Sequence, residues 1–517
     1  MKYTEKLVFL FCVILFSTPF ITTSYFATLD GPAHLYNAQL IKTLLTENND
    51  KISSFFKFNS EIVPNLIGHI YLVILKFFTT SLIAEKALLL SYAFGLSYSF
   101  RALIRVISPE RVTLSYFIFP FIYSFVFALG FYNFSIGIIL MILSIRYYLI
   151  INEKQKFTFK NIILFTGLLL LTFYSHALNL VFTLIAIATH KTFVTLYTIG
   201  FKKYIQQFVV NNKFILITFI LPLILFLNYY IPRITESNQL FLSKKELLFS
   251  YINIRPLIVY SYEIDLIHTR RIFYLIALTI IISFLYILKN KSILLAEKIK
   301  KIANPWFIIA FILFIMSMIL PDQDLNGGFV SVRFIYIFFI FILLGTAFLK
   351  PNKKIILIIL IPYLFTGYQL VKQHNKTIVD LNNVAKECVR AGKFIPDNSV
   401  VLPYDLSNNW MLGHFSNYLG PENKIIILEN YECFNNYFPL NWNYDKIPKL
   451  TLSNQKSDNL ETNIVRGASA LETKIDYLFI LGDRNDMKEK NPKIDSLLNN
   501  SSKSIYLSKK CSLYKLD

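Results

Sequence analysis

Long apolar runs without a charged side chain constrain the fold of this chain more than any other feature. Leu7 to Leu29 and Val112 to Ile145 contain no Asp, Glu, Lys or Arg. A membrane-spanning helix needs about 20 apolar residues, so the first run suits one span and the second exceeds one. Only 16% of the residues are charged, against about a quarter in soluble proteins. We therefore expect a multi-pass membrane protein.

The first run could instead be a secretory signal peptide, with MKYTEK as its basic segment. We favour a retained membrane helix, because the run is longer than the roughly 7–15 residues of a signal-peptide core. Further candidate spans lie at 63–80, 86–105, 112–130, 133–151, 161–175, 177–199, 213–232, 272–289, 304–320, 334–349 and 355–371. The sequence thus predicts an α-helical polytopic membrane protein with about 11–13 transmembrane helices.

The net charge of +20 comes largely from short basic loops between these predicted spans, such as 151–160, 289–305 and 348–354. Such loops usually face the cytoplasm, so we expect no nucleic-acid partner, and contact with anionic membrane lipid is the other interpretation. The same loops place the C-terminal part outside, whereas the side of the N-terminus stays open. Abundant Lys, Asn, Ile and Phe indicate an AT-rich bacterial genome, and hence a bacterial inner membrane with a periplasmic C-terminal domain.

The character of the chain changes near residue 372, where the sequence becomes mixed and polar. Three short apolar segments predict buried strands, and a fourth predicts a terminal hairpin: SVVLPYD (399–405), KIIILEN (424–430), DYLFILGD (476–483) and 504–517. We therefore expect a transmembrane domain at 1–371 and a soluble extracytoplasmic α/β domain at 372–517. Residues 408–443 are dense in Trp, Tyr and Asn, and we expect most of these aromatic residues to be core.

A carboxylate and an imidazole follow the first apolar run directly, in TLDGPAH (28–34). The apolar residues after them recur at helical spacing and predict an amphipathic helix along the membrane surface: Tyr36, Leu40, Ile41, Leu44 and Leu45. Asp30 precedes this helix and Pro32 lies in its first turn, so Asp30 could simply be an N-cap. His34 lies one turn later on the same face.

Three further polar residues interrupt or border predicted spans. His69 lies at the start of the second span, His176 in YSH (174–176) breaks the long stretch 161–190, and Arg333 ends the loop 321–333. Ionisable groups at such places are functional candidates. A helix-packing hydrogen bond would also explain His176, and an anchor at the membrane interface would explain Arg333.

Together these features resemble the GT-C superfamily of membrane glycosyltransferases, which includes protein O-mannosyltransferases, lipid A aminoarabinose transferases and oligosaccharyltransferase catalytic subunits. The shared pattern is a carboxylate after the first span, a juxtamembrane helix, a polar break at YSHALNL (174–180), a late loop ending in Arg333, and a C-terminal α/β domain. The resemblance covers nearly the whole length as architecture, and its motifs are one aspartate and a few loop positions. It implies a GT-C-like transmembrane domain with a first external loop at 26–62.

This resemblance implies transfer of a sugar from a polyprenyl-phosphate-linked donor to a glycan, lipid or protein acceptor. Asp30 would be the general base that takes the acceptor proton. Arg333 would bind the phosphate leaving group with its planar fork. His34, His69 and His176 would join Arg333 in binding substrate. The chain has no Gly-rich phosphate loop, which disfavours a nucleotide-sugar donor.

The residues of the first loop do not decide whether the protein needs a divalent metal cation. GT-C members often carry paired acidic residues there, whereas Asp30 is followed by Gly31. Asp30 and His34 could be ligands of a single metal ion, because carboxylate and imidazole both suit transition metals. Two ligands do not complete a site.

Three other classes of protein remain as alternatives. A polysaccharide polymerase or ligase would depend on a large external loop between late spans. A lipid-linked glycan flippase or transporter predicts related halves, and the sequence contains no internal repeat. A scaffold protein would explain only the C-terminal domain. Convergence of Asp30, His69, His176 and Arg333 on one external cavity would favour the glycosyltransferase.

Overall fold

The computed structural model describes residues 2–154, 157–236, 239–289, 294–323, 327–445, 474–483, 498 and 502–516. The chain forms two compact units. The first contains Met1–Thr18, Ser91–Ala128 and Asn133–Asn375. The second contains Pro19–Leu90, Leu129–Tyr132 and Lys376–Asp517. Segments far apart in the sequence therefore build each unit.

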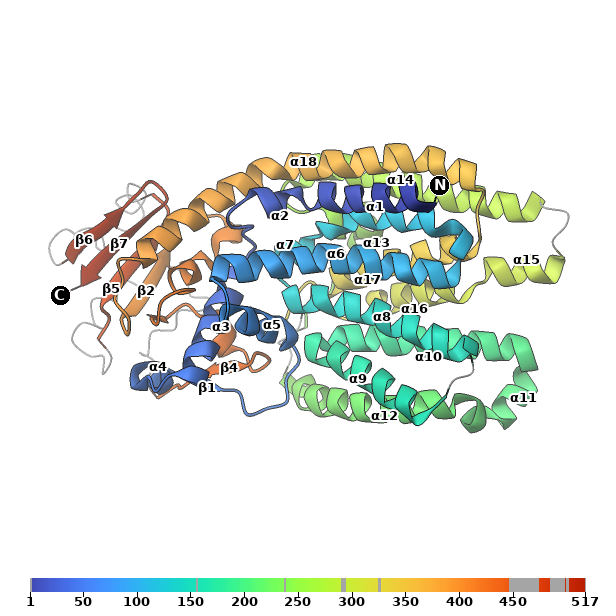
Figure 1. Cartoon of the computed structure of the whole chain (residues 1–517), viewed down its shortest axis with the longest axis horizontal. Helices are drawn as coiled ribbons and strands as arrows, with labels where there is room; N and C mark the ends of the chain where they lie inside the picture. The colour runs from blue at the N-terminus through green and yellow to red at the C-terminus, as the bar shows by residue number, and fades with distance from the viewer. Residues whose placement is uncertain are drawn as a thin grey trace. The chain divides into compact units, whose positions relative to one another are not determined.

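Seven helices in the described part of the chain are long and apolar enough to cross a membrane (Figure 1). They are α6 (Ser81–Ile107), α8 (Tyr132–Lys154), α10 (Ala177–Ile199), α12 (Phe208–Tyr230), α14 (Tyr262–Lys289), α17 (Val330–Phe348) and α18 (Lys353–Gly392). Shorter apolar helices are α5 (Ile67–Lys76), α9 (Phe159–Ser175) and α16 (Pro305–Ile319). The length and composition of the seven long helices suit a multi-pass membrane protein, as the apolar runs predict.

Short helices connect these elements in the first unit. They are α11 (Phe201–Gln206), η2 (Ile231–Glu236), α13 (Lys244–Ile252), η3 (Arg255–Leu257) and α15 (Leu295–Ile302). Helix α13 begins with a capping box, in which Ser243 and Glu246 exchange hydrogen bonds with each other's backbone. Such a box satisfies the first free N–H groups of a helix.

Three predicted spans are not continuous α-helices of membrane-spanning length, and that expectation is wrong for all three. The run 63–80 contains only α5 (Ile67–Lys76), which is 10 residues long, whereas a span needs about 20. The run 7–29 forms α1 (Lys2–Phe16) and α2 (Thr18–Thr22). The run 112–130 lies in a 3₁₀ helix, η1 (Pro109–Ile122), and a short helix, α7 (Phe125–Ala128). Pro19 accounts for the break between α1 and α2, because proline lacks the N–H of the α-helical hydrogen bond and clashes with the preceding turn. Pro120 removes one such N–H near the end of η1.

The polar break predicted at YSH is confirmed. Helix α9 ends at Ser175 and α10 begins at Ala177. His176 between them has an extended backbone, with φ of −164° and ψ of 127°, and its Nδ1 atom accepts a hydrogen bond from the Leu178 N–H at 3.2 Å. Helix α9 packs against both α10 and α12 (Figure 1).

A five-stranded sheet organises the C-terminal part of the second unit, with strand order β3-β2-β5-β7-β6. Its strands are β2 (Val400–Asp405), β3 (Ile426–Ile427), β5 (Tyr477–Leu481), β6 (Ser502–Leu507) and β7 (Cys511–Leu516). Strand β2 is parallel to β3 and β5, whereas β7 is antiparallel to β5 and β6. The three predicted strands and the terminal hairpin are confirmed. Every residue of β5, the central strand of this mixed sheet, is buried.

Short helices follow strands β2 and β3 of this sheet. They are η4 (Trp410–Leu412), η5 (Phe415–Leu419) and η6 (Tyr431–Phe434). Helix α18 runs without a break through residue 371, where the sequence changes character, to Gly392. Its last turns contact the terminal hairpin, since the Tyr506 hydroxyl donates a 2.5 Å hydrogen bond to Glu387.

The first loop and the C-terminal residues pack together within the second unit. Strand β1 (Phe56–Phe58), which follows α4 (Asp50–Phe55), pairs antiparallel with β4 (Leu440–Trp442). The rings of Phe56 and Trp442 stack with centroids 4.4 Å apart. Strands β1 and β4 therefore lie on the same side of any membrane that the chain spans.

Helix α3 (Gly31–Thr46) is not an amphipathic helix on a membrane surface, so that expectation is wrong. Its predicted polar side is covered, since Asn37, Gln39 and Thr43 are buried, whereas Leu45 of its predicted apolar side is 60% exposed. Residues from the C-terminal part of the second unit pack against α3. The Tyr36 hydroxyl donates to the Ile425 carbonyl at 2.7 Å and accepts from the Ile427 N–H at 3.0 Å.

A buried histidine and carboxylate cluster as the candidate functional site

Asp30 occupies the position before the first residue of α3, but its carboxylate makes no capping hydrogen bond. The Gly31 N–H is satisfied by Thr28 Oγ1 instead, at 3.1 Å. Pro32 has no N–H to satisfy and suits the first turn of a helix. The carboxylate of Asp30, in a residue only 7% exposed, is therefore not used to begin the helix.

A close approach of two backbone segments fixes Asp30 in place. Its N–H donates to the Leu129 carbonyl at 3.1 Å, and Gly130 has a φ of +82°. A Cβ atom on Gly130 would lie 2.7 Å from the Asp30 nitrogen, and one on Gly31 would lie 2.5 Å from Thr28 Oγ1. Only glycine fits such spaces without a shift of neighbouring atoms.

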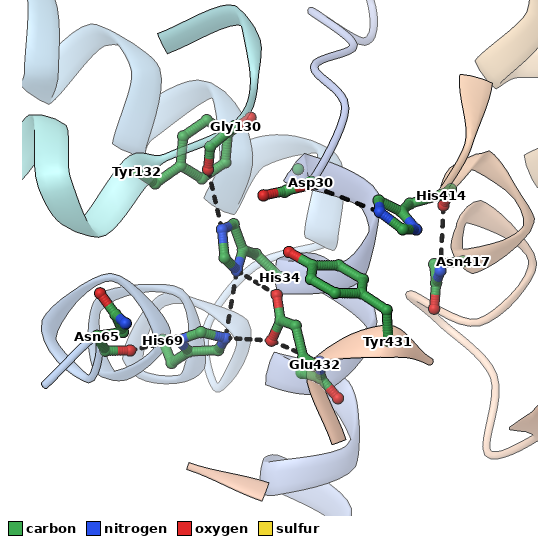
Figure 2. Close-up of polar contacts among 12 residues, drawn as sticks. Asp30, His34, Asn65, His69, Gly130, Tyr132, His414, Asn417, Tyr431 and Glu432 are labelled. Atoms are coloured by element: carbon green, nitrogen blue, oxygen red, sulfur yellow. Dashed lines mark hydrogen bonds and ion pairs between the residues drawn. The ribbon is translucent and has the colours of Figure 1, made fainter. Parts of the chain in front are cut away.

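His414 faces Asp30 from the segment between β2 and β3. Its Nε2 atom lies 3.7 Å from Asp30 Oδ1, and its Nδ1 atom lies 2.5 Å from Glu429 Oε1. The other oxygen of Glu429 accepts hydrogen bonds from Ser416 at 2.9 Å and Asn417 at 2.5 Å. An imidazole is thus held between two carboxylates. The ring of Tyr431 stacks on His414 at 4.0 Å and directs its hydroxyl toward Asp30 and His34 (Figure 2).

Burial shifts the proton affinity of these groups in opposite directions. Burial raises the pKa of Asp30 to about 6, although the charges of His414 and His34 oppose the shift. Burial lowers the pKa of His414, but the Glu429 carboxylate outweighs it and raises this pKa to about 9. A carboxyl group with a pKa near neutrality can both take and return a proton at physiological pH.

We expect the ion pair between His414 and Glu429 to make stability depend on pH. The folded pKa of His414, about 9, exceeds the ordinary value of about 6.5. Its contribution is therefore complete below about pH 6.5 and is lost as the pH rises through the folded value. As the pH is raised from the ordinary to the folded pKa of His414, the apparent melting temperature of the wild type should decrease. That of His414→Gln should decrease less. Parallel curves for the two proteins would contradict this expectation.

A second group of side chains lies beside Asp30, where His34, His69 and Glu432 converge (Figure 2). His34 Nδ1 lies 3.3 Å from His69 Nε2 and 2.5 Å from Glu432 Oε1. His69 Nε2 lies 2.8 Å from Glu432 Oε2. The three side chains are at most 5% exposed. They come from α3, the start of α5, and the segment after β3.

The outer atoms of this group are held by neighbouring polar groups. The Gly130 carbonyl lies 2.9 Å from His34 Nε2, and the Asn65 carbonyl lies 3.0 Å from His69 Nδ1. Burial raises the pKa of Glu432, but the two imidazoles outweigh it and hold that pKa well below its usual range. For His34, burial lowers the pKa and the Glu432 charge outweighs it, so the pKa is raised. Two imidazole nitrogens and a carboxylate within 4.8 Å of one another could hold a metal ion.

The predicted site residues fall in two places. Asp30, His34 and His69 come together in the second unit, whereas His176 and Arg333 belong to the first. In that unit, Arg333 Nη1 lies 3.4 Å from His176 Nε2. The three side chains whose possible metal-binding atoms lie close together are His34, His69 and Glu432, and Asp30 is not among them. The metal pair of Asp30 with His34, and the convergence of the four residues on one cavity, stay predictions.

Sequence reasoning missed His414, Glu429, Tyr431 and Glu432, which lie in the aromatic segment 408–443 that was expected to be mostly core. One signal could have found three of them. Glu429 lies near the end of KIIILEN (424–430), the predicted buried strand that contains β3, and Tyr431 and Glu432 directly follow it. Functional groups gather beyond the carboxyl ends of parallel strands. A scan against protein-family models and a search of curated proteins found no match for this chain.

Proposed function

We propose that this protein is an integral-membrane glycosyltransferase of GT-C type, which moves a sugar from a polyprenyl-phosphate-linked donor to an extracytoplasmic acceptor. The observation that carries the proposal is the buried carboxylate of Asp30. It makes no capping hydrogen bond and has an imidazole 3.7 Å away, where an ordinary helix start would use its carboxylate as a cap.

In the proposed reaction, the acceptor hydroxyl oxygen attacks the anomeric carbon of the donor sugar. Its proton passes to the Asp30 carboxylate, which acts as general base. The bond between the anomeric carbon and the phosphate oxygen breaks, and the polyprenyl phosphate leaves with the electron pair. His414, whose Nδ1 atom is held by Glu429, is a positioning residue that directs its Nε2 atom toward Asp30.

The proposal assigns Arg333 to the donor phosphate. Arg333 is 9% exposed and lies at the start of α17, with its guanidinium 5.6 Å from the centre of the Phe134 ring. We expect Arg333→Ala to raise the KM for the donor more than Arg333→Lys does. Lysine keeps the positive charge but loses the planar fork that binds phosphate oxygens in pairs.

Donor titrations with the two variants measure this difference. Lys353→Ala, at the first residue of α18, is a control that removes an exposed positive charge. Equal KM values for Arg333→Ala and Arg333→Lys would mean that Arg333 does not bind a phosphate. A donor KM unchanged in both would leave Arg333 as an interfacial anchor.

The proposed topology follows the basic loops. It has about 11–13 transmembrane helices, a bacterial inner-membrane location, and both the first loop and the C-terminal residues outside the cytoplasm. Single cysteines introduced at Asn48 and Ser508, with the four native cysteines replaced, would be labelled by a membrane-impermeant reagent. Labelling of both sites in intact spheroplasts supports this topology. Labelling only after the membrane is opened would contradict it.

The direct test is an assay of membranes that contain the protein. Polyprenyl-phosphate sugars that differ in the sugar are supplied with membranes as the source of acceptor. The proposal predicts release of polyprenyl phosphate and a sugar-modified product for at least one donor, in wild type but not in Asp30→Asn. Movement of an intact donor across the membrane without a product would indicate a flippase. Transfer of whole glycan chains, without transfer of single sugars, would indicate a polymerase or ligase.

A further inference from the structure

We propose that His34, His69 and Glu432 bind a divalent transition-metal ion, with zinc as the ion that best suits the geometry. The two imidazole nitrogens and the carboxylate of this group face one another in the interior of the second unit (Figure 2). The site does not depend on the proposed glycosyl transfer, because it is inferred only from the positions of these atoms.

The hydrogen bonds at the outer nitrogens determine which ring atoms can bind a metal. A backbone carbonyl only accepts hydrogen bonds. His34 Nε2 lies 2.9 Å from one carbonyl oxygen, and His69 Nδ1 lies 3.0 Å from another. These two nitrogens must therefore carry the hydrogens. In the neutral rings, the lone pairs then lie on His34 Nδ1 and His69 Nε2, the two atoms that face each other. Metal-binding histidines are typically oriented by such an outer carbonyl.

The distance between the two inner nitrogens fits a tetrahedral ion. Zinc binds imidazole nitrogen at about 2.0–2.1 Å, so two nitrogens of a tetrahedral site lie roughly 3.3 Å apart. His34 Nδ1 and His69 Nε2 are 3.3 Å apart. Two lone pairs at this separation repel each other unless a cation or a proton lies between them.

The carboxylate completes the set of ligands. Glu432 Oε1 is buried without a well-aligned hydrogen bond, although it lies 2.5 Å from His34 Nδ1. The other oxygen accepts a 2.6 Å hydrogen bond from Asn37, which holds the carboxylate in place. Both distances from Glu432 to the histidines, 2.5 and 2.8 Å, are shorter than a tetrahedral site requires. To reach the roughly 3.3 Å separation of a tetrahedral site, Glu432 would move outward by roughly 0.5–0.8 Å when the ion binds.

Two histidines and one glutamate are the ligand set of a catalytic rather than a structural zinc site. Structural sites use four protein ligands, whereas catalytic sites keep one position for water or substrate. Asp30 and the hydroxyl group of Tyr431 lie beside these ligands (Figure 2), where they could contact a water or substrate in the open position. The ligands come from α3, α5 and the segment after β3. A bound ion would therefore stabilise the packing of the first loop against the C-terminal residues.

Metal content of the purified protein tests the proposal. The full chain is purified in detergent through a tag without histidine, stripped with a chelator, supplied with zinc sulfate and freed of excess zinc by gel filtration. We expect about one zinc per chain in the wild type and a several-fold loss in His69→Ala and Glu432→Gln, as the ligand count requires. Cobalt supplied in place of zinc should give the visible absorption of a tetrahedral site.

The matched control is His374→Asn, which removes another buried histidine that contacts a carboxylate, with Nε2 of His374 2.9 Å from Asp265. This variant should keep the zinc. Wild-type protein that elutes as a folded species and retains no zinc would overturn the proposal. Equal zinc in wild type and His69→Ala would overturn it as well. A failed transfer assay with stoichiometric zinc would refute the proposed function and leave the metal site standing.

Discussion

Asp30→Asn is expected to lower the rate of sugar transfer by about 10²–10⁴-fold, the usual contribution of a positioned acid–base group. The protein should remain folded and inserted. Asparagine is nearly the same size as aspartate and caps a helix about as well, and the Asp30 carboxylate makes no capping hydrogen bond in any case. The amide differs in that it cannot take the acceptor proton.

Initial rates of transfer in membranes with equal amounts of wild type and variant measure this effect. Asp50→Asn is the matched control, because Asp50 is an exposed aspartate of the same loop, at the first residue of α4. It should transfer sugar at the wild-type rate. Near-wild-type transfer by Asp30→Asn would show that this carboxylate is not the general base, and the proposed mechanism would fail with it.

Glu432→Ala is expected to destabilise the protein by about 3–5 kcal/mol, the cost of removing one partner from a buried charge pair. Glu432 lies 2.5 and 2.8 Å from two histidines whose side chains are at most 5% exposed. In the metal-free protein, a proton lies between the inner nitrogens, and without the carboxylate this buried positive charge would have no negative partner. Asn37 would also lose an acceptor for its 2.6 Å hydrogen bond.

Thermal unfolding in detergent after chelator treatment measures this change apart from any effect of a metal. Glu47→Ala is the control, since Glu47 forms a surface ion pair with Lys424 at 2.6 Å and exposed pairs contribute only about 0–1 kcal/mol. The apparent melting temperature should fall much further for Glu432→Ala. A fall no larger than that of Glu47→Ala would mean that the His34, His69 and Glu432 group contributes little to stability.

The sequence by itself determined the features that depend on neighbouring residues. Apolar runs predicted most of the membrane helices, YSH predicted the break at His176, and short apolar segments predicted β2, β3 and β5. These features could be predicted because the period and length of an apolar run reflect local backbone geometry. Prediction failed within 7–29, 63–80 and 112–130, where the apolar pattern continued although no α-helix of spanning length formed. In 7–29, Pro19 accounts for the break.

Only the tertiary structure decided what surrounds Asp30 and His34. Glu432 lies hundreds of positions from His34 in the sequence, yet Glu432 Oε1 lies 2.5 Å from His34 Nδ1, and His414 approaches Asp30 from the same part of the chain. No local pattern encodes such a pair, because the contact forms only after the first loop packs against the C-terminal residues through β1 and β4. The same packing buried the polar side of α3, which its own sequence had predicted to be exposed. The sequence could thus name three residues of the site, Asp30, His34 and His69, and long-range packing supplied their carboxylate and imidazole partners.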